Sequence, residues 1–427
     1  MSEFRYRSVT EVAGLAGLCL FAAAGLQHSQ AASLAGAILL GVLLLRRPRI
    51  VWPSWHNPLV LLSLTLSLYV LCRGLLRYAE APEQAELIGR WTGYYFLAAG
   101  LPAIVLALSL EASRARILLV LNIALAALVV AILRDMDEGQ LAAYRQGARA
   151  FFGLGNAAGL YISSALLGVL LLVPWGAPGS ATSAAWPHRL RQALFLAVLA
   201  LLAVALVWHQ NRSVLLAVLV VFPVLAWLSL RRRGADPAAR FPRWVLIALG
   251  LSLAVMLFVG GGDIKQRFEQ GFVSARLALT VDAATLPRSA AGERISLWRI
   301  GWRSAGEYPL FGRGPGSVSE LVREHPVVAR HSHLHNLYLQ LLVELGLVGL
   351  LLFLALVGCL MRELLWHRSA LSWDLRRFTG GSLALFLLTN LTQVRIDGNH
   401  AHFFVTLLMA LAMTGALAFK QDARGRV

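Results

Sequence analysis

The 427-residue chain contains few charged residues. Only 14% of its residues are charged, 58% are hydrophobic, and the mean hydropathy is +0.66. A soluble globular protein carries about 25% charged residues, so this shortage excludes an ordinary water-soluble domain. One protein core cannot bury so much apolar sequence, whereas a lipid bilayer can surround it. The composition therefore predicts a membrane protein.

Cysteines and acidic residues are also scarce. The three cysteines, Cys19, Cys72 and Cys359, fall in or beside apolar runs, which predicts neither a disulfide nor a cysteine-based metal site. The chain has 22 Asp and Glu against 39 Lys and Arg, so its net charge is +17. The cytoplasmic loops of a membrane protein account for such a surplus, and no nucleic-acid partner is expected.

Twelve apolar runs approach the length of about 20 residues that crosses the hydrocarbon layer of a bilayer. In lipid each run must satisfy its own backbone hydrogen bonds, which predicts helices, and the alternation of a membrane β-barrel is missing. The fold class expected is an all-α polytopic membrane protein with about twelve transmembrane helices. The predicted spans are 9–27, 31–45, 57–76, 91–110, 115–133, 151–173, 190–208, 211–229, 242–260, 335–361, 378–394 and 401–419.

The distribution of Arg and Lys predicts the orientation of these spans. With the N-terminus in the cytoplasm, 21 basic residues lie on the cytoplasmic side and 8 in the short outer loops. The positive-inside rule therefore places both termini in the cytoplasm. Three regions follow: spans one to nine in 1–260, a large outer loop in 261–334, and spans ten to twelve with a cytoplasmic tail in 335–427. Within the loop, RISLWRIGWRSAGE predicts a short amphipathic helix at the headgroup level.

Histidines gather where the tenth span begins, in HSHLHNLYLQLLVELGLVG. A neutral His335 could accept a proton from a hydroxyl group and act as a general base. The alternative is an interfacial helix start in which Asn336 caps the helix. The alternate spacing of His331, His333 and His335 would place them on one face of an extended strand, as in a zinc site. No Cys or well-placed carboxylate completes such a site, so no metal is predicted.

Arginines at the outer ends of helices are candidates for binding an anion. Arg212 falls in the first turn of span eight, where its charge adds to the positive helix end unless an anion lies between them. Its alternative role is to extend toward the interface. Many arginines of the loop will form solvated ion pairs. Glu344, inside span ten, and Asp397 are candidate partners for the site. The alternative for Glu344, which we favour, is hydrogen bonding within the bundle. The predicted substrate-binding residues are Arg294, Arg299, Arg303, Arg313, Asn336 and His333.

The segment that begins at His335 resembles a known signature. His335 and Asn336, then nine residues, then Gly346-Leu347-Val348-Gly349 is similar to the pattern of the bacterial O-antigen ligase family, within the O-antigen ligase/polymerase superfamily. That family has about twelve spans, a large periplasmic loop between two late spans, and an arginine at the outer start of a mid-chain helix. Here that arginine is Arg212, in NRSVLLAVL. The stretch from Arg294 through Gly312–Gly316 resembles the part that precedes the family histidine.

The resemblance implies a GT-C-like glycosyltransferase of the bacterial inner membrane whose active site faces the periplasm. The donor would be O-antigen polysaccharide on undecaprenyl pyrophosphate, and the acceptor a sugar hydroxyl of lipid A–core oligosaccharide. His335 would deprotonate the acceptor, the anomeric carbon would invert, and Arg212 with Arg294 would stabilise the pyrophosphate without metal or cofactor.

Four other functions stay open at this stage. They are an O-antigen polymerase, a protein O-oligosaccharyltransferase, a transporter of lipid-linked glycan and a zinc-dependent membrane hydrolase. Transporters usually contain inverted repeats, and the sequence shows none.

Overall fold

The computed structural model describes residues 2–24, 29–46, 57–146, 148–173, 188–231, 290–326, 328–365 and 369–424, and the single positions 269, 273, 276 and 277. Within these residues the regular structure is helical throughout. The elements are α1 (Ser2–Ala24), α2 (Ser29–Arg46), α4 (Pro58–Glu80), η1 (Pro82–Gln84), α5 (Ala85–Ala98), α6 (Leu101–Leu110), α7 (Arg114–Arg134), α8 (Glu138–Arg145), η2 (Gly155–Ala157), α9 (Ala158–Leu172), α10 (His188–His209), α11 (Arg212–Arg231), α13 (Ala290–Glu307), α14 (Ser317–Arg323), α15 (Leu337–Leu365), α16 (Trp373–Thr389) and α17 (Asn399–Arg424).

Helices lie at the predicted apolar runs in the described residues, although α16, at the predicted span 378–394, is not among the helices apolar enough to cross a membrane. Five stretches are long and apolar enough to cross a membrane: Pro58–Glu80, Pro82–Leu110, Arg114–Arg134, Gly155–Leu172 and Leu337–Leu365. Five shorter apolar helices lie in α1, α2, α10, α11 and α17. The all-α prediction is confirmed in this part of the chain. The total of twelve spans stays a prediction, and the ninth, 242–260, lies outside the described residues, as does 261–289, apart from 269, 273, 276 and 277.

One predicted span, 91–110, consists of two helices rather than one. Helix α5 ends at Ala98 and α6 begins at Leu101, with Gly100 between them at φ +86°. Glycine adopts this left-handed conformation at little cost, and Pro102 favours the first turn of the new helix. A hydropathy window cannot detect this break, because both halves are apolar.

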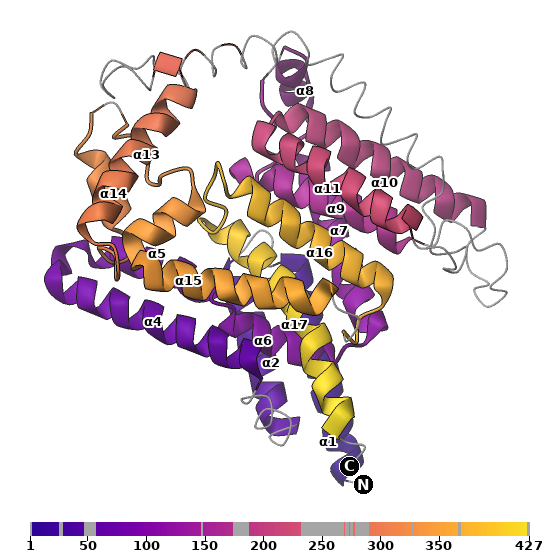
Figure 1. The fold of residues 1–427 in the computed structure, drawn as a ribbon. Helices are drawn as coiled ribbons and strands as arrows, with labels where there is room; N and C mark the ends of the chain where they lie inside the picture. The colour runs from indigo at the N-terminus through magenta and orange to yellow at the C-terminus, as the bar shows by residue number, and fades with distance from the viewer. Residues whose placement is uncertain are drawn as a thin grey trace.

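The helices pack so that those of the predicted loop cover one end of the bundle. In Figure 1, α13 and α14 lie over the ends of α5 and α15, and α13 packs directly against α15. Helix α15 also packs on α4, while α16 packs on α9 and α11. The segment between α14 and α15 carries the three histidines, and it joins the loop helices to the bundle.

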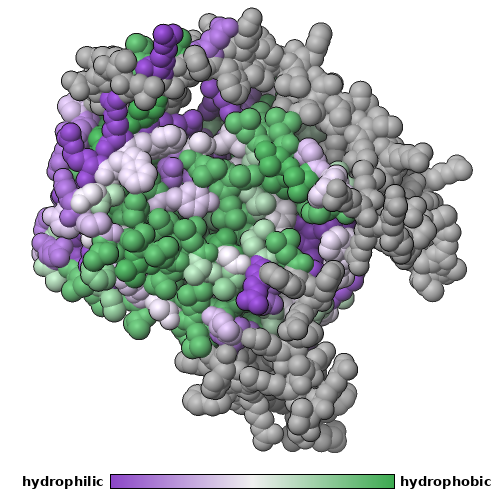
Figure 2. Space-filling view, viewed as in Figure 1, coloured by the Kyte–Doolittle hydropathy of each residue, from purple (hydrophilic) through white to green (hydrophobic). Residues whose placement is uncertain are grey.

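The outer surface of α4 and α15 is apolar. Figure 2 shows hydrophobic side chains gathered over this face and hydrophilic ones over α13 and α14. The large exposed apolar residues there are Leu61, Leu68, Leu71, Leu75, Leu76, Leu347, Leu351, Leu354 and Leu365. Such a surface would favour aggregation in water but suits contact with lipid.

Helix α15 is interrupted at Gly346, the first glycine of the sequence signature. Gly346 has φ +69° and ψ −174°, so the helical hydrogen bonds around it cannot form. The loop before α14 replaces them: Leu347 and Val348 donate their N–H groups to Pro309 and Leu310, at 2.9 and 3.2 Å. In return, the N–H groups of Arg313 and Gly314 donate to Val343 and Glu344, at 2.8 and 2.9 Å. An interruption in an apolar helix is tolerable only when protein groups satisfy its backbone in this way.

The interruption should make position 346 intolerant of any side chain. A Cβ at this position would meet the backbone of Leu310 and Phe311, which cannot rotate away. We expect Gly346→Ala to lower the free energy of unfolding by about 3 kcal/mol or more, from steric overlap and the positive φ. Gly358→Ala is the matched control, since open space surrounds that glycine on the same helix. Thermal unfolding of both variants in detergent tests this, and equal stability would contradict it.

Candidate active site

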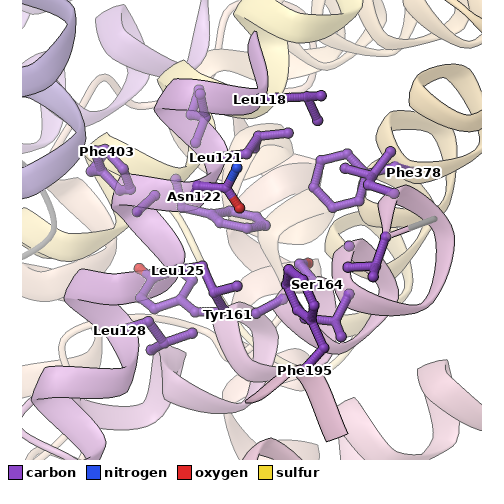
Figure 3. Close-up of a pocket in the computed structure, with 18 residues that line it drawn as sticks. Leu118, Leu121, Asn122, Leu125, Leu128, Tyr161, Ser164, Phe195, Phe378 and Phe403 are labelled. Carbon is purple, nitrogen blue, oxygen red and sulfur yellow. The ribbon is translucent and has the colours of Figure 1, made fainter. Parts of the chain in front are cut away.

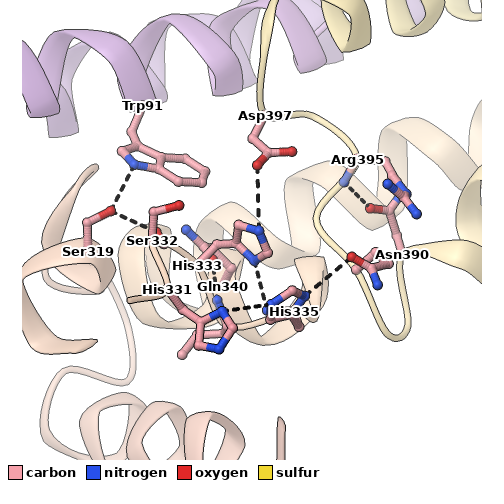
Figure 4. A network of polar contacts seen from close by, with 12 residues as sticks. Trp91, Ser319, His331, Ser332, His333, His335, Gln340, Asn390, Arg395 and Asp397 are labelled. Atoms are coloured by element: carbon pink, nitrogen blue, oxygen red, sulfur yellow. Dashed lines mark hydrogen bonds and ion pairs between the residues drawn. The ribbon is translucent and has the colours of Figure 1, made fainter. Parts of the chain in front are cut away.

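Three histidines meet at the start of α15 (Figure 4). The ring centroids of His331 and His335 lie 5.0 Å apart, and those of His333 and His335 lie 4.2 Å apart. The extended strand suggested by their alternate spacing is not formed, because His335 has φ +52° and the chain turns sharply there. A residue other than glycine rarely adopts this conformation, which costs on the order of 1–3 kcal/mol. Such strain is typical of functional sites.

Contacts from several elements hold this turn in place. Trp298 of α13 donates its indole N–H to the carbonyl of Leu334 at 3.0 Å, and Leu334 donates its N–H to Gln340 of α15 at 3.0 Å. Asn336 accepts a hydrogen bond from the N–H of Leu339 at 3.0 Å, which is the capping arrangement. Trp298 thus faces inward, whereas Trp302 is 65% exposed. The predicted amphipathic helix is present as α13, with Trp298 directed toward the histidine turn and Trp302 exposed.

Glu344 stabilises the same region through hydrogen bonds of its buried side chain. Its carboxylate accepts hydrogen bonds from the Tyr95 hydroxyl at 2.6 Å, the Val318 N–H at 3.0 Å and the Gln340 side chain at 3.4 Å. These contacts join α5, α14 and α15 around one fully buried carboxylate. The predicted role of Glu344 within the bundle is confirmed.

The hydrogen bonds of His335 determine which ring nitrogen is free. Its Nδ1 lies 3.3 Å from Oε1 of Gln393, an atom that only accepts, so Nδ1 carries the proton of the neutral ring. Its Nε2 therefore presents a lone pair. His333 accepts the backbone N–H of His335 on Nδ1 at 3.2 Å, so its own proton lies on Nε2, which is 3.6 Å from the Asp397 carboxylate. Figure 4 shows these contacts in sequence.

The surroundings keep these imidazoles neutral. Burial, followed by repulsion from Arg294, lowers the pKa of His335 to about 4. Burial and the neighbouring His335 lower the pKa of His333 to about 3. At neutral pH His335 is therefore an uncharged base with an available lone pair.

Arginines from separate parts of the chain surround this base. Arg294, half-buried on α13, and Arg395, in the turn between α16 and α17, both repel protons from His335 and His333. Arg149, before α9, repels Arg294 in turn, and burial together with this repulsion lowers the pKa of Arg294. Cations placed so close together favour a multiply charged anion. The sequence predicted Arg294 but not Arg149 or Arg395.

Arg212 begins α11 at the same end of the bundle, as predicted, and is half-buried. Three residues earlier, His209 ends α10, with Nδ1 2.7 Å from the carbonyl of Ala150. His209 interacts electrostatically with Arg395 and Arg149. The start of α11 therefore adjoins the region that the other arginines occupy.

Arg395 is the most unusual of these arginines. It is only 4% exposed, yet its Nε and Nη2 have no hydrogen-bond partner among the described residues. Asp397 attracts it electrostatically, but no ion pair within 4 Å joins the two. Burial lowers the pKa of Arg395 to about 10, so it stays cationic at neutral pH. A buried, incompletely paired charge is costly unless an anion binds to it.

We expect Arg395→Met to leave the unfolding temperature of the free protein unchanged or to raise it. The reason is that methionine removes a buried cation with two unsatisfied nitrogens and keeps much of the volume. The matched control is Arg376→Met, since Arg376 is equally buried but donates to the carbonyls of Leu364 and Leu365. That control should lower stability by about 2 kcal/mol. Equal losses in the two variants, measured by thermal unfolding, would contradict this expectation.

Residues 197–354 match a family model described as O-antigen ligase. This segment is a member of the O-antigen ligase family. It contains Arg212, Arg294 and His335, the three residues on which the sequence resemblance depends. The match therefore confirms the predicted family. No curated protein matches the chain.

The other arginines predicted for substrate binding differ in their exposure and partners. Arg299 is half-buried on α13, and Arg303 is exposed on the same helix. Arg313 pairs with Glu307 at 3.3 Å, stacks 5.0 Å from the Tyr308 ring, and lines a separate polar pocket of about 500 Å³ with Arg73 and Arg77. Substrate binding by these arginines and by Asn336 stays a prediction.

An apolar pocket lies outside the matched segment 197–354, between helices on either side of it in the sequence (Figure 3). It has a volume of about 240 Å³ and lies between α7, α9, α10, α16 and α17. Its lining runs along α9 from Tyr161, near the start of that helix, to Val173, just beyond its end. Tyr161 interacts electrostatically with Arg395. The cationic region and the apolar pocket are therefore neighbours, which suits an amphiphilic ligand.

Metal ligation finds no support in the geometry of the histidines. In the part of the chain that the structure describes, no group of three or more His, Cys, Asp or Glu side chains is arranged to hold a metal ion. The rings of His331, His333 and His335 instead contact one another and neighbouring residues at hydrogen-bonding distances.

Proposed function

We propose that the protein is an O-antigen ligase of the bacterial inner membrane. It transfers O-antigen polysaccharide from undecaprenyl pyrophosphate to a sugar hydroxyl of lipid A–core oligosaccharide on the periplasmic side. The observation that supports this most strongly is the neutral, half-buried His335 among the arginines Arg294 and Arg395. A base beside an anion site is what the displacement of a pyrophosphate by a hydroxyl requires.

The proposed reaction is a single displacement. Nε2 of His335 accepts the proton of the acceptor hydroxyl, and the oxygen attacks the anomeric carbon from the side opposite the pyrophosphate. The bond between that carbon and the pyrophosphate breaks, and its electron pair stays on the leaving oxygen. Arg212, Arg294 and Arg395 stabilise the charge that develops there. The isoprenoid tail of the donor would lie in the apolar pocket beside Tyr161.

The proposal is tested by transfer between purified components. Wild-type protein in detergent is mixed with lipid-linked O-antigen and lipid A–core in the presence of EDTA, and the glycosylated lipid A–core is detected on gels. Transfer in EDTA supports a metal-independent ligase. Chain elongation of the donor without transfer to lipid A–core would indicate a polymerase instead, and glycosylation of added protein would indicate a protein oligosaccharyltransferase. Activity that returns only with zinc would contradict the mechanism.

The protein should retain its transfer activity at mildly acidic pH. Burial and Arg294 lower the pKa of His335 to about 4, so the base stays neutral until the pH approaches that value. We therefore expect kcat/KM to fall only as pH decreases through about 4, rather than through about 6.5 as for an exposed histidine. A pH profile of transfer, with protein integrity checked at each pH, measures this midpoint. A midpoint near 6.5 would contradict a buried base.

A further inference from the structure

His331 makes contacts with Glu293 and His335 that the proposed reaction does not use. Nε2 of His331 lies 3.1 Å from Oε2 of Glu293, and this carboxylate oxygen only accepts when it is ionised. The proton of a neutral His331 therefore lies on Nε2, and Nδ1 presents a lone pair. That Nδ1 lies 3.2 Å from Nε2 of His335.

Two lone pairs thus face each other across a hydrogen-bonding distance. His335 has its proton on Nδ1, toward Gln393, and His331 has its proton on Nε2, toward Glu293. Neither nitrogen has a hydrogen to donate while both rings are neutral. The contact becomes a hydrogen bond when one additional proton enters it. The two imidazoles together are therefore a proton acceptor whose charge can spread over two rings.

Glu293 is placed to balance that charge. It is largely buried on α13, with a side-chain exposure of 12%, and its other oxygen, Oε1, accepts from Arg330 at 2.5 Å. Burial acts to raise the pKa of Glu293, but the hydrogen bonds from Arg330 and His331 outweigh it and lower the pKa overall. The carboxylate is therefore ionised at neutral pH.

We propose that Glu293 and His331 form a proton relay behind His335, which rests on the proposed function. The acceptor hydroxyl donates to Nε2 of His335, its O–H bond breaks and the proton stays on Nε2. Once the oxygen has moved onto the anomeric carbon, Nδ1 of His331 shares that proton across the 3.2 Å contact. The resulting cation is paired with the carboxylate of Glu293, and the proton later leaves to water or to the released pyrophosphate. His335 remains the residue that touches the substrate. Glu293 and His331 act through it as positioning residues.

Other charged groups also act on this pair. Arg294 of α13 and Arg395 of the α16–α17 turn disfavour a proton on His335. His333 lies 4.2 Å from His335, ring to ring, and its Nε2 faces Asp397. Among the described side chains that contact the pair, Glu293 is the carboxylate that reaches His331 directly. Its removal should therefore weaken the base more than removal of a more distant carboxylate.

The test uses the full-length protein in the transfer assay and compares two single variants and their combination. Glu293→Gln should lower kcat by about 10- to 100-fold with little change in KM, because a weaker base slows deprotonation without altering substrate contacts. His331→Gln should give a similar loss, and the double variant should lose no more than His331→Gln alone, since both residues act through one chain. In a His335→Ala background, Glu293→Gln should have no further effect.

Arg330→Gln is the matched control, since Arg330 touches the same carboxylate from the solvent side and is 70% exposed. Its plateau kcat should stay at the wild-type level. The acidic midpoint of its pH profile should rise, by up to about half a unit, because Glu293 is then free to favour the cation. This rise should vanish when Glu293→Gln is added. A purely structural role for Glu293 would not produce these linked shifts.

The outcomes separate the relay from the proposed function. Wild-type kcat in Glu293→Gln, or additive losses in the double variant, would overturn the relay while leaving the ligase reaction intact. If the wild type elongates its donor instead of modifying lipid A–core, the proposed function fails, and the same variants are scored on elongation. Absence of any glycosyl transfer by the wild type would overturn both.

Discussion

Replacing His335 should reduce glycan transfer by about 10³-fold, the usual contribution of a general base. The reduction should appear in kcat, because Nε2 of His335 takes the proton only as the new bond forms, whereas substrate binding relies on the arginines. His335→Asn is the best variant, since asparagine tolerates the φ of +52° at this position better than other side chains do. It also lacks any group that could accept the proton at neutral pH.

The experiment compares this variant with His325→Ala in the same transfer assay. His325 is an exposed histidine near the end of α14, and its Nδ1 contacts only the carbonyl of Leu321 in the described structure. It should retain wild-type activity. Unfolding temperatures of the two variants show whether the fold is intact. If His335→Asn is folded and transfers glycan at the wild-type rate, His335 has no part in the chemistry.

Replacing Arg294 should reduce transfer by about 10²- to 10³-fold, as removal of a group that stabilises developing charge commonly does. Arg294 is half-buried on α13 and interacts with His335, His333 and Arg395. Its charge therefore lies where the proposed leaving pyrophosphate would be. Arg294→Ala should also raise the acidic midpoint of the pH profile, because the guanidinium no longer opposes a proton on His335.

These two effects distinguish a direct role from a structural one. A general loosening of α13 would reduce activity without a systematic rise of the midpoint. Arg323→Ala is the control, since Arg323 lies exposed at the end of α14. Arg294→Lys tests the guanidinium itself, since lysine keeps the charge but cannot bind a phosphate through two parallel hydrogen bonds. Wild-type activity in Arg294→Ala would show that the pyrophosphate is held elsewhere.

The sequence predicted the parts of the molecule that depend on local composition. Apolar runs coincide with helices across the described residues, because each run must form its own hydrogen bonds in lipid. Arg212, Arg294 and His335 were predicted from the ends of such runs and from a motif, and the structure places them at one end of the bundle. Asn336 was considered as a helix cap, and its oxygen accepts the N–H of Leu339 as a cap would.

The features that the sequence did not predict depend on contacts between distant segments. Arg395 sits in a short turn far from the matched family segment, and only the fold brings it beside Arg294. Glu293 is one of several acidic residues in the predicted loop, and only the position of α13 in the fold brings it into contact with His331. The interruption at Gly346 could not be inferred from hydropathy, because its replacement hydrogen bonds come from residues more than thirty positions earlier.

The interruption at Gly346 also gives a physical meaning to the fixed spacing in the motif. Nine residues, Leu337–Leu345, separate the His335-Asn336 pair from Gly346, which amounts to about two and a half helical turns. The loop before α14 fixes one end of this helical segment through its hydrogen bonds around Gly346, and the turn at His335 adjoins the other end. Each added or deleted residue would rotate the histidine by about 100° around the helix axis. Its ring would then point away from Gln393 and His331. The number of residues in this helical segment therefore sets the direction in which the base points.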